Sequence, residues 1–388
     1  MTPPWRIANG RVLTGDGIRE TDLTIEGERI AAVGGSAGAA AIDARGALVL
    51  PGIVDLHGDA FERQLMPRPG VTFGVDLALL DSDRQLVANG ITTAFHAITC
   101  SWEPGLRSLG HARELVAAIG RLAPQLACDT RVHLRHEVFN LDAIEDLLGW
   151  IARGEVHLLA LNDHTPAMAK HVGEANRLDR IAERCGMGRE AFGTLLRGVF
   201  ARAGEVPAAV ARVAAAAVAA GIPVASHDDE TPDMRRARHA LGARLCEFPF
   251  TRETAATAKE LGDVVVMGAP NVVRGGSHIK LVAAADMVAA GLCQVLTSDY
   301  FYPALAQAPF RLVRDGVADL AAAWPLVSTN PARAVGMDDR GAIAAGLRAD
   351  IVLIDDRGAM PRPVATIAGG RLAYADGRLA GAGFLAAA

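Results

Sequence analysis

The chain has 388 residues, a length that suits a large barrel with an accessory lobe better than one small domain. Hydrophobic residues make up 51% of the chain and charged residues 21%, so it can bury a sizeable core and disorder is not expected. The net charge of −5 argues against a nucleic-acid-binding protein, and almost all positive charge is arginine, because the only lysines are Lys170, Lys259 and Lys280.

Five widely spaced cysteines without a Cys-x-x-Cys pair predict neither a zinc ribbon nor a disulfide framework. The start, MTPPWRIANG, lacks the pattern of a signal peptide. The alanine-rich run 206–224 is interrupted by Arg212, Gly221 and Pro223 and predicts a buried helix rather than a membrane span. We expect a cytoplasmic protein that binds neither membrane nor nucleic acid, and a homodimer, the commonest assembly of soluble enzymes.

Short alternating segments separated by glycine and aspartate turns fill residues 1–50 and predict β-hairpins. A similar pattern returns near the other end, in RADIVLIDDRGAM and VATIAGGRLAYADGR. We therefore predict a small β-sandwich domain formed by both termini, residues 1–50 and 340–388. A second domain then covers residues 51–339.

The middle of the chain alternates apolar strand candidates with helical stretches. The candidates are GIVDLHGD (52–59), GITTAFHAIT (90–99), TRVHLRHEVF (130–139), VHLLALNDHT (156–165), IPVASHDDE (222–230), CEFPFT (246–251), DVVVMGAP (263–270) and CQVLTSD (293–299). Eight such units predict an α/β fold, a distorted (β/α)8 TIM barrel. An open doubly wound sheet is the alternative.

Polar residues stand at the carboxyl ends of these strand candidates, where barrels carry their chemistry. With period-two alternation, Asp55, His57 and Asp59 share one face of the first strand, and Val54 and Leu56 share the other. The same alternation on the third strand places His133, Arg135 and Glu137 toward the barrel axis. Further polar ends are Asn162 and His164, His227 with Asp228 and Asp229, and Asp299.

Taken singly, each of these residues is more often a hydrogen-bonded structural side chain or a helix cap. Together at one barrel mouth, several buried carboxylates and imidazoles are costly without a compensating cation. Divalent metals bound by histidine and carboxylate ligands provide that charge. The strand ends therefore predict a metal centre.

Five motifs carry a resemblance to a known family: LMPRPGV (65–71), SHDDET (226–231), EFPFT (247–251), MGAPNVVRGGSH (267–278) and SDY (298–300). With the PGIVDLH entry strand, they resemble the amidohydrolase superfamily, and within it the PhnM-type α-D-ribose 1-methylphosphonate 5-triphosphate diphosphatases. The resemblance covers nearly the whole chain.

The resemblance implies a ligand set. His57 and Asp59 match the first-strand metal ligands, His227 the fifth-strand ligand, and Asp299 the eighth-strand ligand and catalytic residue that orients and deprotonates the attacking water. Many members bridge two metals with a strand-four lysine, which is missing here, so Glu137 is the expected bridge and His164 a further ligand. Glu247 stands where a sixth-strand histidine is usual. One or two divalent ions are expected, zinc first, with manganese or iron as alternatives.

The implied reaction is metal-dependent hydrolysis of the α–β phosphoanhydride of α-D-ribose 1-methylphosphonate 5-triphosphate, giving the 5-phosphate and pyrophosphate in phosphonate catabolism. Such a phosphorylated small molecule needs arginines, which bind phosphate through paired hydrogen bonds. The expected substrate-binding residues are Arg63, Arg68, Asp228, Arg274, Gly275, Gly276, His278 and Lys280.

Departures from the family pattern leave the exact substrate open. They are Gly58 and Ala60 in HGDA, His96 on the second strand, and Ile279–Leu281 after the glycine pair. One alternative is a cyclic amidase or deaminase of the same superfamily. A non-catalytic scaffold is less favoured, because His57, Asp59, His227 and Asp299 are retained.

Overall fold

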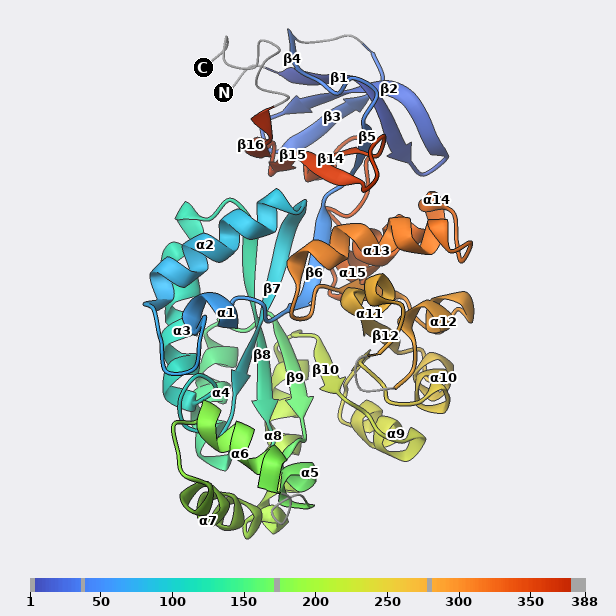
Figure 1. Ribbon diagram of the computed structural model, residues 1–388. Helices are drawn as coiled ribbons and strands as arrows, with labels where there is room; N and C mark the ends of the chain where they lie inside the picture. The colour runs from blue at the N-terminus through green and yellow to red at the C-terminus, as the bar shows by residue number, and fades with distance from the viewer. Residues whose placement is uncertain (1–3, 36–38, 171–174, 278–280, 378–388) are drawn as a thin grey trace.

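The computed structural model of this chain describes residues 4–35, 39–170, 175–277 and 281–377. Within them the strands form two eight-stranded sheets, one a parallel barrel sheet and the other built from both ends of the chain. Figure 1 shows the terminal sheet, in blue and red, above the barrel. The predicted TIM barrel with a small terminal β domain is confirmed, while the boundaries at 50/51 and 339/340 stay a prediction.

The barrel strands follow one another in chain order, and every neighbouring pair is parallel. The first and last strands are joined by one isolated bridge, between Gly58 and Asp299, so the barrel is nearly closed. All eight strand candidates are recovered. They are β6 (Ile53–Gly58), β7 (Ile91–Cys100), β8 (Asp129–Glu137), β9 (Leu158–Asn162), β10 (Val224–His227), β11 (Leu245–Glu247), β12 (Val264–Gly268) and β13 (Val295–Thr297).

Helices connect these strands or follow the last of them, and many of them pack on the outside of the barrel (Figure 1). They are α1 (Glu62–Leu65), α2 (Val75–Ala88), α3 (Leu109–Leu122), α4 (Ile144–Ala152), α5 (Thr165–Lys170), α6 (Ala175–Arg184), α7 (Arg189–Phe200), α8 (Val206–Ala219), α9 (Pro232–Ala240), α10 (Arg252–Glu260), α11 (Ala269–Arg274), α12 (Ala284–Ala289), α13 (Tyr302–Arg314), α14 (Leu320–Ala323) and α15 (Thr329–Ala334). Short 3-10 turns cover Ala123–Gln125, Leu141–Ala143, Ala203–Glu205 and Trp324–Val327.

The alanine-rich run forms α8, as expected, and buries one face of that helix. In the described part of the chain, no helix combines the length and the apolar character that crossing a membrane requires. All five cysteines are buried and unpaired.

An apolar cluster fills the barrel interior between the terminal sheet and the carboxyl ends of the strands. It brings together side chains from β6, β7, β9, β10, β11, β12 and β13 with Ala332 of α15, which only the inside of the barrel can do. Val54 and Leu56 belong to this cluster, so the strict alternation expected for the first strand was wrong. The pairing of β6 with β7 shifts register between Asp55 and Gly58, and this irregularity lets His57 point inward as well.

The terminal sheet unites distant parts of the chain. Its strands run in the order β16-β15-β14-β5-β1-β2-β3, with β4 paired to β1, and one apolar core gathers side chains from both ends of the sequence. Its strands are β1 (Trp5–Thr14), β2 (Gly17–Glu26), β3 (Arg29–Val33), β4 (Ala39–Asp43), β5 (Leu48–Pro51), β14 (Ile351–Asp355), β15 (Arg362–Ala368) and β16 (Arg371–Ala375). Since β5 leads directly into β6, the sheet fixes where the first barrel strand begins.

A buried ion-pair network supports the carboxyl end of β10. The Arg235 side chain is fully buried and lies 3.0 Å from Asp229 and 3.3 Å from Asp263. It also donates to the Ala243 carbonyl oxygen at 2.9 Å. Removing this guanidinium takes the arginine charge away from two buried carboxylates.

We expect Arg235→Ala to lower the free energy of unfolding by about 3–5 kcal/mol, measured by urea denaturation. The matched control is Arg236→Ala, because that neighbouring guanidinium is exposed and pairs only with exposed Asp233. The control should change stability by less than about 0.5 kcal/mol. Equal effects of the two substitutions would contradict the assigned role of Arg235.

Candidate metal centre

A cavity of about 250 Å³ opens at the carboxyl ends of the barrel strands. Imidazole and carboxylate side chains share its lining with two guanidinium groups. The residues of this kind are His57, Asp59, Arg135, His227, Asp228, Arg274 and Asp299. Four of the predicted metal ligands therefore face one cavity, as the barrel topology implied.

Three residues at this mouth adopt left-handed backbone conformations, which side chains other than glycine rarely take. They follow β10, β11 and β13: Asp228 with φ 61°, Phe248 with φ 54° and Asp299 with φ 53°. Backbone hydrogen bonds to neighbouring strands hold each of them. The Asp228 amide donates to the Glu247 carbonyl oxygen at 2.9 Å, and the Asp299 amide donates to that of His57 at 2.8 Å. Strain held in this way is typical of functional sites.

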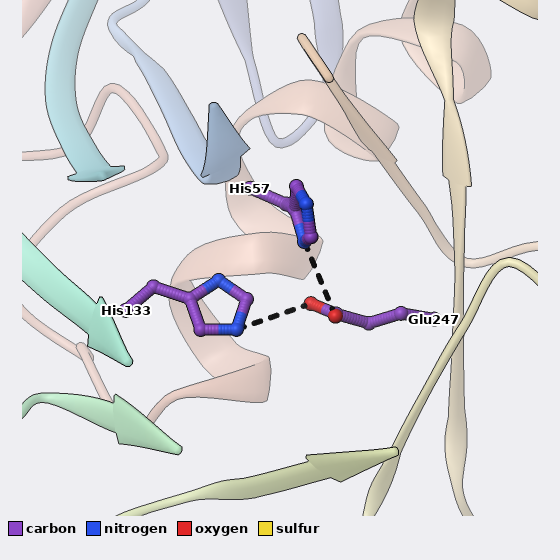
Figure 2. Close-up of side chains that lie close together, drawn as sticks. All are labelled: His57, His133 and Glu247. Carbon is purple, nitrogen blue, oxygen red and sulfur yellow. Dashed lines mark hydrogen bonds and ion pairs between the residues drawn. The ribbon is translucent and has the colours of Figure 1, made fainter. Parts of the chain in front are cut away.

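Below the cavity, three buried side chains from β6, β8 and β11 converge (Figure 2). His57 Nδ1 lies 3.1 Å from Glu247 Oε2, and His133 Nε2 lies 3.8 Å from Glu247 Oε1. Their ligand atoms lie within 4.8 Å of one another, close enough to share one metal ion. We call His57, His133 and Glu247 the buried triad.

Hydrogen bonding within the buried triad leaves two atoms unsatisfied. His133 Nδ1 contacts the Leu56 carbonyl oxygen at 2.9 Å, which makes this nitrogen the N–H donor and leaves the lone pair on Nε2. That Nε2 and the facing Glu247 Oε1 are buried without a hydrogen-bond partner. Two lone pairs facing each other across 3.8 Å are unfavourable, but nitrogen and oxygen ligands at about 2.0–2.2 Å from one cation would use both. A histidine that donates its other N–H to a carbonyl is also typical of metal ligands. The residues fit a divalent ion.

The pKa shifts of the buried triad are also compatible with a bound divalent ion. Burial lowers the pKa of both His57 and His133 to about 3, so these imidazoles are neutral and offer lone pairs. Burial raises the pKa of Glu247 to about 7, while the Arg135 charge and His133 act in the opposite direction. A cation among these groups would favour the carboxylate form of Glu247.

A second group of ligand-type atoms lies at the rim of the cavity and consists of His164, His227 and Asp228. We call it the rim triad. His164 Nε2 lies 3.2 Å from Asp228 Oδ2, and His227 Nδ1 lies 3.2 Å from Glu247 Oε2. Burial lowers the pKa of His164, but the hydrogen bond to Asp228 and the Glu137 charge outweigh it, so the pKa lies above its ordinary value.

Arg135 stands between the two triads. Its guanidinium donates to Asp59 Oδ2 at 3.3 Å and to His227 Nε2 at 3.0 Å. The Asn162 amide, turned with its oxygen toward Arg135, accepts two further hydrogen bonds, at 3.2 and 3.3 Å. The Arg135 side chain is 6% exposed.

Asp299 faces the cavity from the end of β13. Burial raises the pKa of its carboxyl to about 7, helped by the nearby charges of Asp59 and Asp228 and opposed by Arg135. A carboxyl group with a pKa near neutrality can accept and return protons at physiological pH.

Other predicted residues lie elsewhere. Glu137 does not line the cavity, and its carboxylate accepts hydrogen bonds from the Thr165 hydroxyl at 2.7 Å and the His164 amide at 3.2 Å. Its role as a metal bridge stays a prediction. Arg63 and Arg68 are exposed outside the cavity lining, with Arg63 over the Phe301 ring.

The glycine-rich segment after α11 reaches the cavity in part. Arg274 and Gly276 line it, and Arg274 donates to the Tyr300 hydroxyl at 3.2 Å. Gly275 ends α11 in a left-handed conformation, with φ 80°. His278 and Lys280 lie outside the described residues.

Among the departures from the family pattern, Leu281 lines the cavity. His96 does not, and its ring packs edge-on against Phe61. Ile279 lies outside the described residues.

Three residues of the site were not among the predicted functional residues: His133, Arg135 and Glu247. The alternation of the third strand already placed His133 and Arg135 inward, and Glu247 already stood at the end of the sixth strand. Their polar character at inward strand positions was the available signal.

A family model described as "Amidohydrolase family" matches residues 48–373. The chain is also 33% identical over 334 residues to the Escherichia coli (strain K12) alpha-D-ribose 1-methylphosphonate 5-triphosphate diphosphatase. That match covers 81% of this chain and 84% of the relative.

Solved structures share the fold at lower identity. An amidohydrolase from a Sargasso Sea environmental sample matches with a TM-score of 0.65 and 17% identity, over 96% of this chain and 93% of the other. A D-hydantoinase from Bacillus sp. AR9 matches with a TM-score of 0.62 and 16% identity, over 97% of this chain and 96% of the other.

The buried triad predicts the effect of replacing its carboxylate. Glu247→Gln removes the charge that a cation needs and should weaken zinc binding by about 100-fold or more, measured by competition with a zinc-binding dye. Glu253→Gln on α10 is the control, because Glu253 is exposed, and it should bind zinc like the unmodified protein. Unchanged affinity in Glu247→Gln would exclude the triad as the zinc site.

The raised pKa of Asp299 predicts a pH-dependent stability in metal-free protein. The folded state holds this proton more tightly, so the contribution of Asp299 is complete below about pH 4 and is lost as pH rises through about 7. Asparagine does not titrate. Relative to the unmodified protein, Asp299→Asn should therefore gain about 2–4 kcal/mol of unfolding free energy between about pH 4 and pH 8.

Urea denaturation of chelator-treated protein across this pH range measures the effect. Asp233→Asn is the control, since its carboxylate is 95% exposed. A stability difference for Asp299→Asn that stays constant with pH would show that the Asp299 pKa is not raised.

Proposed function

This chain belongs to the amidohydrolase family and to its PhnM-type branch, and we propose that it is a metal-dependent diphosphatase. The proposed substrate is α-D-ribose 1-methylphosphonate 5-triphosphate. Hydrolysis of its α–β phosphoanhydride gives the 5-phosphate and pyrophosphate. Zinc as the metal, a cytoplasmic location and a homodimer stay predictions.

One observation carries the proposal: a single cavity is lined both by side chains of the metal-ligand type and by guanidinium groups of the kind that bind phosphate. His57 connects the cavity to the buried triad. Arg274 and Gly276 provide a guanidinium and a backbone segment at the cavity lining for an anionic group. The 33% identity to the E. coli diphosphatase, along most of both chains, supports the same substrate class.

The residues of the chain divide the chemistry. A divalent ion, when bound, supplies a Lewis acid that activates water and neutralises phosphate charge. The His57 and His133 imidazoles and the Glu247 carboxylate would hold that ion. Asp299 is the general base, because it faces the cavity and its pKa is near neutrality.

Charge around the polyphosphate is balanced by guanidinium groups of the chain. Arg135 lines the cavity and is fixed by Asp59 and His227. Arg274 is held by the Tyr300 hydroxyl on another part of the lining. Substrate bound between them would place its anhydride near Asp299, and the proton that Asp299 accepts would pass to the leaving pyrophosphate.

The test is product analysis with α-D-ribose 1-methylphosphonate 5-triphosphate. We expect pyrophosphate and the 5-phosphate in equal amounts, and Asp299→Asn should reduce turnover by about 10²–10⁴-fold while folding and zinc content are retained. Asp319→Asn is the control, because Asp319 caps α14 away from the cavity, and turnover should be unchanged. Turnover of Asp299→Asn near that of the control would remove Asp299 from the reaction.

The same assay separates the alternatives. Release of ammonia or a ring-opened acid from cyclic amides, without pyrophosphate release, would favour a cyclic amidase or deaminase. Purified protein that binds no metal and hydrolyses neither class of substrate would favour a non-catalytic scaffold.

A further inference from the structure

Two groups of metal-ligand side chains lie at the barrel mouth, yet they differ in what they have left to bind. The buried triad keeps two unsatisfied atoms, His133 Nε2 and Glu247 Oε1. The rim triad is already paired internally and with Arg135. The difference between the two triads bears on whether the site binds one divalent ion or two.

We propose that the Arg135 guanidinium permanently takes the second cation position, so that the chain binds one divalent ion, on the buried triad. The inference rests on the metal-dependent function proposed above. It assigns Arg135 as a positioning residue that fixes the stoichiometry of the metal centre.

The hydrogen bonds of His227 are the first support. Its Nδ1 contacts Glu247 Oε2 at 3.2 Å, so this nitrogen carries the proton and donates. Its Nε2 accepts from Arg135 at 3.0 Å. Both ring nitrogens are therefore in use, and the imidazole has no lone pair left for a metal while Arg135 stays in place.

The carboxylates of the rim support the same conclusion. Asp228 Oδ2 pairs with His164 Nε2 at 3.2 Å, and Asp59 Oδ2 accepts from Arg135 at 3.3 Å. A second divalent ion would have to break these pairs. It would also meet the positive charge of the buried Arg135 guanidinium.

The position of Arg135 is itself fixed. The Asn162 amide oxygen accepts from Nη2 and Nε of Arg135, and the Asn162 side chain is fully buried on β9. With Asp59 on Nη1 and His227 also on Nη2, the guanidinium is held from three strands or strand ends. Because it also lines the cavity, it offers a phosphate a cation that cannot dissociate with the metal.

The experiment measures metal content without reference to turnover. Protein loaded with zinc and freed of loosely bound ions should contain about one zinc per chain by mass spectrometry. Arg135→Met should raise this to about two, because the rim triad is released. Arg131→Met is the matched control, at the other end of β8, where its guanidinium pairs with Asp129, and should stay at about one.

A second measurement determines the number of bound ions in the unmodified protein, so the proposal can be tested even if Arg135→Met does not fold. With manganese in place of zinc, electron paramagnetic resonance should show isolated ions in the unmodified protein. Two ions per chain or an exchange-coupled pair in that protein would overturn the proposal, as would folded Arg135→Met with one ion.

If metal-free protein binds no zinc at any concentration tested, the proposed metal-dependent function is overturned as well. Two ions with normal pyrophosphate release would overturn only the present inference.

Discussion

The site depends on one electrostatic constraint: a buried imidazole nitrogen and a buried carboxyl oxygen face each other, and neither has a hydrogen-bond partner. His133 Nε2 and Glu247 Oε1 are 3.8 Å apart and otherwise unpartnered. Neither atom reaches water, so the folded chain carries their desolvation cost. A cation relieves this cost, and it couples the stability of the barrel mouth to the ability to bind an ion.

The rest of the mouth is arranged around this point. One Glu247 oxygen contacts the Nδ1 atoms of His57 and His227, which orients both rings and leaves the other oxygen toward His133. Arg135 then balances charge on the side of Asp59 and His227. The two positive charges differ, because the Arg135 guanidinium belongs to the chain, whereas a bound ion can dissociate.

Much of this architecture was readable from the chain alone. Eight apolar runs, most of them ending in polar residues, predicted the barrel, and His57, Asp59, His227 and Asp299 from the predicted strand ends line one cavity. Alternation failed on β6, because a register shift is a property of two paired strands and leaves no mark in one of them. The partners of Arg135 could not be predicted for a similar reason: one directly follows β6 and the others lie on β9 and β10, far apart in sequence.

The terminal sheet has a consequence for the order in which the molecule is completed. Strand β5, immediately before the strand that carries His57, is paired on one side with β1 and on the other with β14, near the far end of the chain. During synthesis on the ribosome, the nascent polypeptide exposes the His57 strand long before residues 351–355 emerge to secure its base. The terminal sheet that holds the start of the His57 strand is therefore complete only after nearly the whole chain has emerged, and a chain that lacked its last strands would leave β5 paired with β1 alone.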